Sequence, residues 1–167
     1  AEVQNQIGLA QLGMGVRADG EKSRRLFAVA VGSFHQALQV FTREQQPQYW
    51  ATVQNNLGHA LAEQGKRTTG EEGNRFLKEA VEACRQALQV FTREQLPQYW
   101  AVTQSNLAEA YVARKEWKEA MECYSNILGL YPSHKETQEN ISSLYQNKLF
   151  DFSKAFDLDS SWVDEHW

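Results

Sequence analysis

One phrase of fifteen residues occurs twice in this chain, fifty residues apart. Residues 37–51 read ALQVFTREQQPQYWA and residues 87–101 read ALQVFTREQLPQYWA, so fourteen of the fifteen positions are identical. The single difference is Gln46 in the first copy against Leu96 in the second. An active site is normally assembled once from scattered residues, whereas a phrase repeated at a fixed interval indicates that one structural unit is stacked on another.

The same interval relates the segments that flank this phrase. Residues 3–11, 53–61 and 103–111 align with one another, and residues 137–145 follow after a further thirty-four positions. In all four segments a glutamine stands three residues before Ile or Leu: Gln4/Ile7, Gln54/Leu57, Gln104/Leu107 and Gln138/Ile141. The alignment therefore defines four units, at residues 1–50, 51–100, 101–134 and, as a partial unit, 135–147.

A second set of residues in each unit predicts a second helix. Its spacings of three and four place these residues on one helix face: Ala30, Phe34 and Ala37, then Ala80, Cys84 and Ala87, then Ala120, Tyr124 and Ile127. The face is too narrow for a helix to stand alone, so we expect paired helices that bury it against their neighbours. The composition agrees with an all-α fold, because helix formers dominate and only three prolines occur.

The chain shows no sign of export or of a membrane span. No apolar run approaches the ~18 residues that a transmembrane helix needs, and no signal peptide opens the sequence. Cys84 and Cys123 give no disulfide framework, which fits a reducing compartment. We expect a cytoplasmic protein that makes no contact with a membrane.

Charge is concentrated at the C-terminus. The chain carries a net charge of −4, and residues 150–167 hold five acidic residues against Lys154 alone, so the preceding part is neutral. A neutral body offers no basic stripe that could follow a phosphate backbone. Nucleic-acid binding is therefore not expected.

The repeated residues resemble the tetratricopeptide repeat (TPR), a helix–turn–helix of about 34 residues with a characteristic pattern of Leu, Gly, Tyr, Ala, Phe and Pro. The third unit fits best, with Leu107, Ala108, Tyr111, Ala120, Tyr124 and Pro132. The second unit matches at Leu57, Gly58, Leu61, Ala80 and Ala87, and the first at Ile7, Gly8, Ala30, Phe34 and Ala37. The resemblance covers residues 1–147 and implies a right-handed superhelical solenoid of antiparallel helix hairpins, with about three and a half repeats.

The first two units are sixteen residues longer than this pattern. Ten of the extra residues lie between the paired helices, and six lie in the duplicated phrase, which joins one hairpin to the next. Pro47 and Pro97 suit the first position of a helix, so we expect helices to start there. The following aromatic pairs should wedge between successive units: Tyr49/Trp50 and Tyr99/Trp100. Elongated joints of this kind are similar to those of kinesin light chains and long bacterial TPR arrays.

The two ends depart from the pattern. At the C-terminus, residues 148–167 are expected to form a short capping helix and an acidic tail, with Phe152, Phe156 and Trp162 covering the last hairpin. The alternative is that the tail, with tryptophan beside acids, docks in the chain's own groove. At the N-terminus no capping pattern precedes the first unit, which favours either self-association through its open face or a sequence cut from a longer array.

The resemblance also implies a binding site. Peptide ligands of the family lie in a concave groove lined by the first helix of each unit, which maps here to Asn5, Gln6, Asn55, Asn56, His59, Ser105, Asn106, Glu109 and Asn140. Carboxamides both donate and accept hydrogen bonds, which suits the backbone of an extended peptide. The alternative is that these amides tie neighbouring helices together. No groove position is basic, so a neutral or basic peptide is favoured over an anionic terminus.

Catalysis has little support in the sequence. The four histidines are scattered, and none is expected to have a partner at metal-ligand spacing. The segment QGKRTTG superficially resembles a phosphate loop, but Ala60 stands where that loop requires glycine. Cys84 occupies a core position of the repeat and is expected to be a buried filler. We therefore expect neither a catalytic residue, nor a metal, nor another cofactor.

These observations favour a non-catalytic scaffold or adaptor that binds a peptide segment of another protein. Two alternatives remain open. The chain could be the regulatory arm of a larger multidomain enzyme, such as a protease or nucleotidase, or a module for self-assembly.

Overall fold

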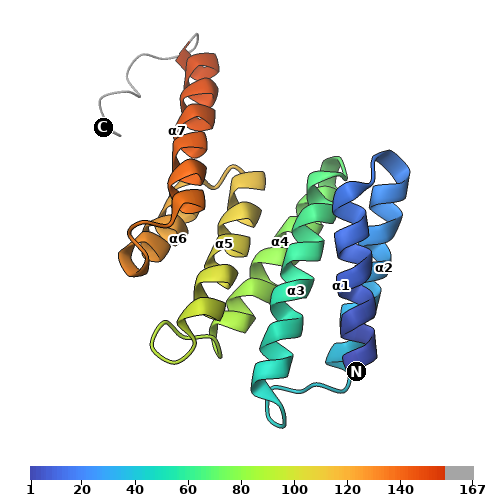
Figure 1. The fold of residues 1–167 in the computed structure, drawn as a ribbon. Helices are drawn as coiled ribbons and strands as arrows, with labels where there is room; N and C mark the ends of the chain where they lie inside the picture. Colours follow the sequence, from blue (N-terminus) through green and yellow to red (C-terminus); the bar gives the residue numbers. More distant parts are fainter. Residues whose placement is uncertain (157–167) are drawn as a thin grey trace.

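The computed structural model describes the backbone of residues 1–156 and the side chains of residues 1–146. The described part is all-helical and contains no strand, which confirms the predicted all-α class (Figure 1). Its helices are α1 (Glu2–Arg17), α2 (Gly20–Leu38), α3 (Pro47–Lys66), α4 (Gly70–Leu88), α5 (Pro97–Ala113), α6 (Trp117–Leu130) and α7 (Lys135–Phe156). None of them is long and apolar enough to cross a lipid bilayer.

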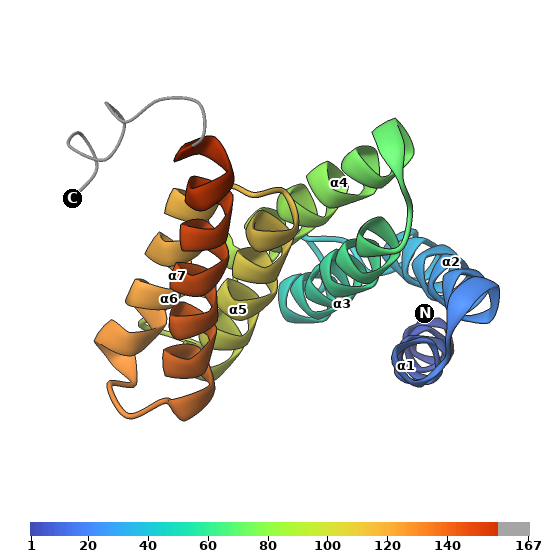
Figure 2. The same cartoon turned by 90° about the horizontal axis from the view of Figure 1, so that it is seen from above.

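The helices form pairs that follow one another across the molecule in chain order. α1 packs on α2, α3 on α4, and α5 on α6, while α2 also contacts α3, α4 contacts α5, and α6 contacts α7 (Figures 1 and 2). The first helices of successive units touch as well, as α1 with α3 and α3 with α5. Every substantial contact in the described part therefore joins elements that are close in sequence.

Glycine allows the two helices of a pair to approach closely. A Cβ atom added to Gly8 would lie 2.5 Å from Cε1 of Phe34, and one added to Gly58 would lie 2.5 Å from Sγ of Cys84. Phe34 and Cys84 are both fully buried at these contacts. Burial raises the pKa of the Cys84 thiol to about 12, so the group is neutral at physiological pH. Cys84 is thus the buried filler that the repeat pattern predicted.

The extra residues that were expected between the paired helices of the first two units instead lengthen those helices, so this expectation is wrong. Only Ala18 and Asp19 separate α1 from α2, and residues 67–69 separate α3 from α4. The second helix of each pair starts at a glycine in the left-handed region, with φ of 56° at Gly20 and 73° at Gly70. A residue without a Cβ takes this conformation at little cost, so the chain reverses in a very short turn.

The duplicated phrase builds the same local structure twice. α3 and α5 start at Pro47 and Pro97, as predicted. In the first copy the rings of Phe41 and Tyr49 stack with centroids 5.3 Å apart. In the second copy, Phe91 and Tyr99 stack at 5.0 Å. An arginine also lies 5.8 Å from a tryptophan ring centroid in each copy, Arg43 over Trp50 and Arg93 over Trp100.

The aromatic pairs do not all wedge between units. Trp100, the fourth residue of α5, is 9% exposed and packs this helix against the preceding hairpin in a buried cluster with Ala51, Ala87 and Phe91, as expected. The expectation is wrong for the two tyrosines, since Tyr49 is 57% and Tyr99 is 54% exposed. They lie on the outside because each ring covers the phenylalanine of its own joint.

The C-terminal unit differs from the prediction in two respects. α7 continues unbroken to Phe156, so the expected boundary at residue 147 is wrong; no Pro or Gly occurs within this helix to end it. Tyr145 stands thirty-four residues after Tyr111, at the same position of the repeat, which predicts that it lies in the core. This prediction is wrong, since Tyr145 is 51% exposed, whereas the neighbouring Leu144 is 2% exposed. One residue turns a helix by about 100°, which moves Tyr145 off the face that packs on α6. The proposed contacts of Phe152, Phe156, Trp162 and the tail lie outside the described side chains.

Candidate functional site

A cleft of about 510 Å³ lies where α3, α5, α6 and the start of α7 meet. It collects four of the nine residues predicted to line a groove: His59, Ser105, Asn106 and Glu109. Its other lining residues are Gln98, Ala101, Val102, Ile127, Tyr131, His134, Glu136 and Thr137. The first helices of two successive units thus supply one wall, and the helices that follow supply the other.

The cleft is lined by both apolar and polar side chains. Ile127 belongs to the buried core, and Val102 presents an apolar side chain that is 56% exposed. Ser105, Asn106 and Gln98 add hydrogen-bonding groups along α5. Apolar surface with a few polar groups is typical of sites that bind ligands.

A smaller cleft of about 320 Å³ adjoins the first between α5 and α7. It contains a fifth predicted residue, Asn140, together with Glu109, Lys66, Tyr124 and Leu144. Glu109 therefore borders both clefts. Burial and the nearby Glu109 carboxylate raise the pKa of the Tyr124 hydroxyl, which stays protonated at neutral pH and can donate a hydrogen bond.

The remaining predicted residues lie outside both clefts, and two of the asparagine pairs join neighbouring helices. Asn56 Nδ2 donates to Asn5 Oδ1 at 3.2 Å, which ties α3 to α1. Asn106 Nδ2 donates to Asn55 Oδ1 at 2.9 Å, which ties α5 to α3 in the same way. The alternative considered for these amides, that they tie neighbouring helices together, is thus observed for these two pairs. Asn106 also lines the larger cleft, and its side chain has a second N–H and a carbonyl besides the N–H that bonds to Asn55.

The sequence did not predict a group of ion pairs at the contact between α3 and α5. Lys66 Nζ contacts Glu63 Oε1, and it lies 3.1 Å from Glu109 Oε2. Arg67 contacts the second oxygen of Glu63. The expected absence of basic groups from the groove is therefore wrong, because Lys66 reaches it from the last turn of α3. The spacing of three between Glu63 and Lys66 was the available signal.

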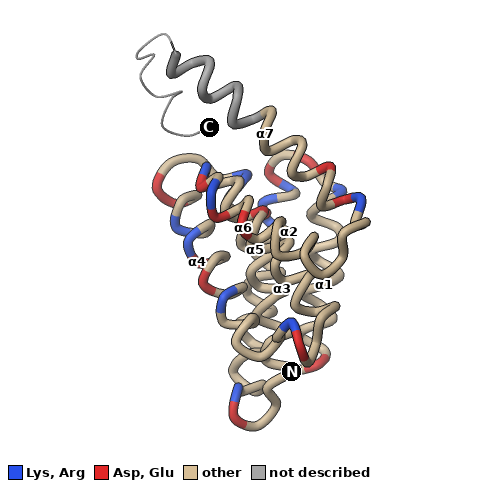
Figure 3. Tube along the Cα trace, turned by 90° about the vertical axis from the view of Figure 1, so that its left-hand side faces the viewer, with Lys and Arg blue, Asp and Glu red and all other residues tan. Residues whose placement is uncertain are grey.

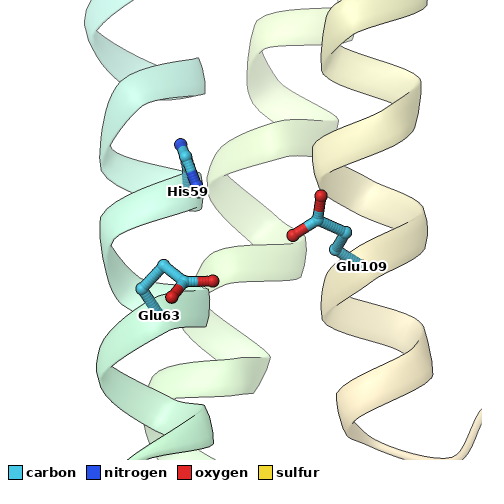
Figure 4. Close-up of side chains that lie close together, drawn as sticks. All are labelled: His59, Glu63 and Glu109. Atoms are coloured by element: carbon cyan, nitrogen blue, oxygen red, sulfur yellow. The ribbon is translucent and has the colours of Figure 1, made fainter. Parts of the chain in front are cut away.

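The expectation that no histidine has a partner at metal-ligand spacing is wrong for His59. His59 and Glu63 stand four residues apart on α3, which places them on one helix face. Figure 4 shows both side chains on the side of α3 that faces Glu109 of α5. One donor atom from each of the three residues lies within 4.8 Å of the others.

Electrostatics favour the ionised forms of these groups. Burial acts to raise the pKa of Glu63, but hydrogen bonds and charges from Lys66 and Arg67 outweigh it and lower the pKa below its ordinary value of 4.5. For Lys66, burial acts to lower the pKa, but Glu109 and Glu63 outweigh it and raise the pKa. Elsewhere, acidic and basic residues are interspersed along the helices that Figure 3 colours.

Neither a scan of protein-family models nor a search of curated proteins finds a match to this chain.

Proposed function

We propose that this chain is a TPR-like array of helix hairpins, arranged as a solenoid, that acts as a non-catalytic scaffold and binds a peptide segment of another protein. The larger cleft carries the proposal, since it gathers apolar surface and hydrogen-bonding side chains from two successive units. The duplicated joint supports it too, because Trp100 packs α5 against the preceding unit and so fixes one wall of the cleft. Binding to such a surface suits a cytoplasmic adaptor.

The lining residues favour a particular peptide chemistry. An apolar side chain of the ligand would cover Val102, while Asn106 and Ser105 hydrogen-bond to the ligand backbone. Glu136 is exposed and lines the cleft, where its carboxylate can attract a basic residue, whereas Glu109 already pairs with Lys66. A neutral or basic segment is therefore favoured, and neither nucleic acid nor a membrane is expected as partner.

Selection from a displayed library of random peptides tests the proposal, followed by affinity measurements on the selected sequences. Val102→Glu should weaken binding by at least about tenfold, because it places a buried charge against the ligand. Val40→Glu is the matched control, since Val40 is 57% exposed, close to the 56% of Val102, and lies outside the cleft. Failure to select any peptide, or equal loss with both variants, would contradict the proposal.

Self-assembly is a second candidate that one observation favours. Val3 and Ile7 on α1 are 70% and 40% exposed, whereas their equivalents Val53 and Leu57 on α3 are 1% and 4% exposed. The preceding unit covers α3, and a second copy of the chain would cover α1. Sedimentation should then show a dimer that Ile7→Glu converts to a monomer; a monomer for the parent chain excludes this role. A regulatory arm of a larger enzyme would use the same cleft to hold an adjoining domain.

A further inference from the structure

The group formed by His59, Glu63 and Glu109 has the composition of a metal site. It offers one imidazole nitrogen and two carboxylate oxygens, with the donor atoms within 4.8 Å of one another (Figure 4). Two ligands come from α3 and one from α5. We propose that these three side chains bind a divalent transition metal, zinc foremost, which clamps the second unit to the third. The inference does not depend on whether a peptide occupies the neighbouring cleft.

The ligand types select among metals. Zinc accepts histidine nitrogen and carboxylate oxygen, and three protein ligands with one water complete a tetrahedral site. Calcium requires six to eight oxygen ligands, and magnesium requires octahedral oxygen coordination, which this group does not provide. The site should therefore distinguish zinc and cobalt from calcium and magnesium.

The two carboxylates of the group already hold a cation between them. The ammonium group of Lys66 bridges the two acidic members of the group, contacting Glu63 Oε1 and lying 3.1 Å from Glu109 Oε2. The Lys66 side chain is 33% exposed and sits on a flexible stem, so it can swing into solvent. A metal ion would replace one positive charge with two at the same place.

The carboxylate of Glu63, the less exposed of the two, is already held in a fixed orientation. The side chain of Glu63 is 10% exposed, and Arg67 contacts its second oxygen. Arg67 also donates to the Glu63 backbone oxygen at 3.1 Å, which fixes the guanidinium. When Lys66 leaves, Glu63 Oε1 becomes available while Arg67 still holds the other oxygen, as outer partners commonly do for metal ligands.

The equivalent contact between α1 and α3 cannot form such a site. Leu9 and Gly13 stand fifty residues before His59 and Glu63, and neither can coordinate a metal. The ligand set is thus particular to the α3/α5 contact and does not follow from the repeat itself.

Titration calorimetry of the whole chain with zinc chloride tests the proposal. We expect one bound equivalent in the parent protein, at least about tenfold weaker binding for His59→Gln and for Glu109→Gln, and no effect of calcium chloride. His134→Gln and Glu136→Gln are matched controls, because both residues line the cleft outside the group. No binding by the parent, or binding that His59→Gln leaves unchanged, overturns the proposal.

Two further measurements sharpen the test. Lys66→Gln removes the competing ammonium and leaves Arg67 to neutralise Glu63, so zinc should bind this variant more tightly than the parent; weaker binding would contradict the proposed displacement. Cobalt(II) spectra then identify the donors. Bands of a tetrahedral ion without thiolate charge transfer support the His/Glu set, whereas a thiolate band would assign the metal to Cys84 or Cys123 and overturn the site.

Discussion

The contact between α1 and α3 and the contact between α3 and α5 share an asparagine bridge but differ in the charged residues beside it. Each has an asparagine bridge, Asn56 to Asn5 in the first and Asn106 to Asn55 in the second, displaced by fifty residues. Beside the second bridge stand His59, Glu63 and Lys66, where the first contact has Leu9, Gly13 and Val16. The repeat therefore supplies the scaffold, and the positions that depart from it supply the candidate site.

The largest expected difference between the two contacts concerns stability. Leu107 is 5% exposed in the core of the third unit, whereas Ile7, at the equivalent position of the first unit, is 40% exposed. Leu107→Ala should lower the free energy of unfolding by ~2–5 kcal/mol, from lost burial and the cavity left behind. Ile7→Ala should cost less than ~1 kcal/mol, because much of the side chain is already hydrated.

Chemical denaturation of both variants makes this comparison. Gln98→Ala serves as a surface control, since Gln98 is exposed and should change stability by less than ~0.5 kcal/mol. A Leu107→Ala protein as stable as the parent would contradict the helix register described for α5.

The asparagine bridges give a smaller effect that separates structure from binding. Asn106→Ala and Asn56→Ala each leave a partly buried amide oxygen without its donor, so each should cost ~1–2 kcal/mol of stability. Only Asn106 lines the larger cleft, so only its replacement should also weaken a selected peptide. Paired melting and affinity measurements decide the matter. Binding that survives in Asn106→Ala would reduce that residue to a purely structural role.

The loss of stability at acidic pH should depend on Glu63 and Lys66 at the α3/α5 contact, which have uncharged residues at the equivalent positions of α1. The folded pKa of Glu63 lies below its ordinary value of 4.5, so the stability this carboxylate contributes is present above that pH and is lost as the pH falls through the folded pKa. Glu63→Gln should therefore flatten the loss of stability below pH 4.5. Urea titrations across this range measure the slope, and identical slopes for parent and variant would contradict the contribution.

Much of the scaffold could be predicted from sequence because each signal is local or repeated. Pro47 and Pro97 mark helix starts through their own backbone geometry. Leu107 and Tyr111, both 5% exposed, lie in the core where their repeat positions placed them. The prediction that Tyr145 lies in the core was wrong because α7 buries a different face, which contains Thr137 and Leu144, each 2% exposed. The contact with α6 decides which face of α7 is buried, and the sequence of α7 alone does not show this contact.

The candidate site was harder to predict because it depends on how two helices meet. His59, Ser105, Asn106 and Glu109, which line the larger cleft, could be named from the sequence because they align with groove-lining positions of the family that the repeat resembles. Lys66 was missed because α3 extends to this residue, about two turns beyond His59. Lys66 and Glu109 are forty-three residues apart in the sequence, and no spacing pattern predicts that such a pair is in contact.

The most direct measurement of the central claim is an NMR titration of the isotopically labelled chain with a peptide selected for binding. The account predicts that the largest chemical-shift changes fall on His59, Ser105 and Asn106 at the α3/α5 contact. Asn5 and Leu9, at the equivalent contact of α1, should stay within experimental error. Changes that are largest on α1, or that are equal at the two contacts, would contradict the claim that departures from the repeat create the site.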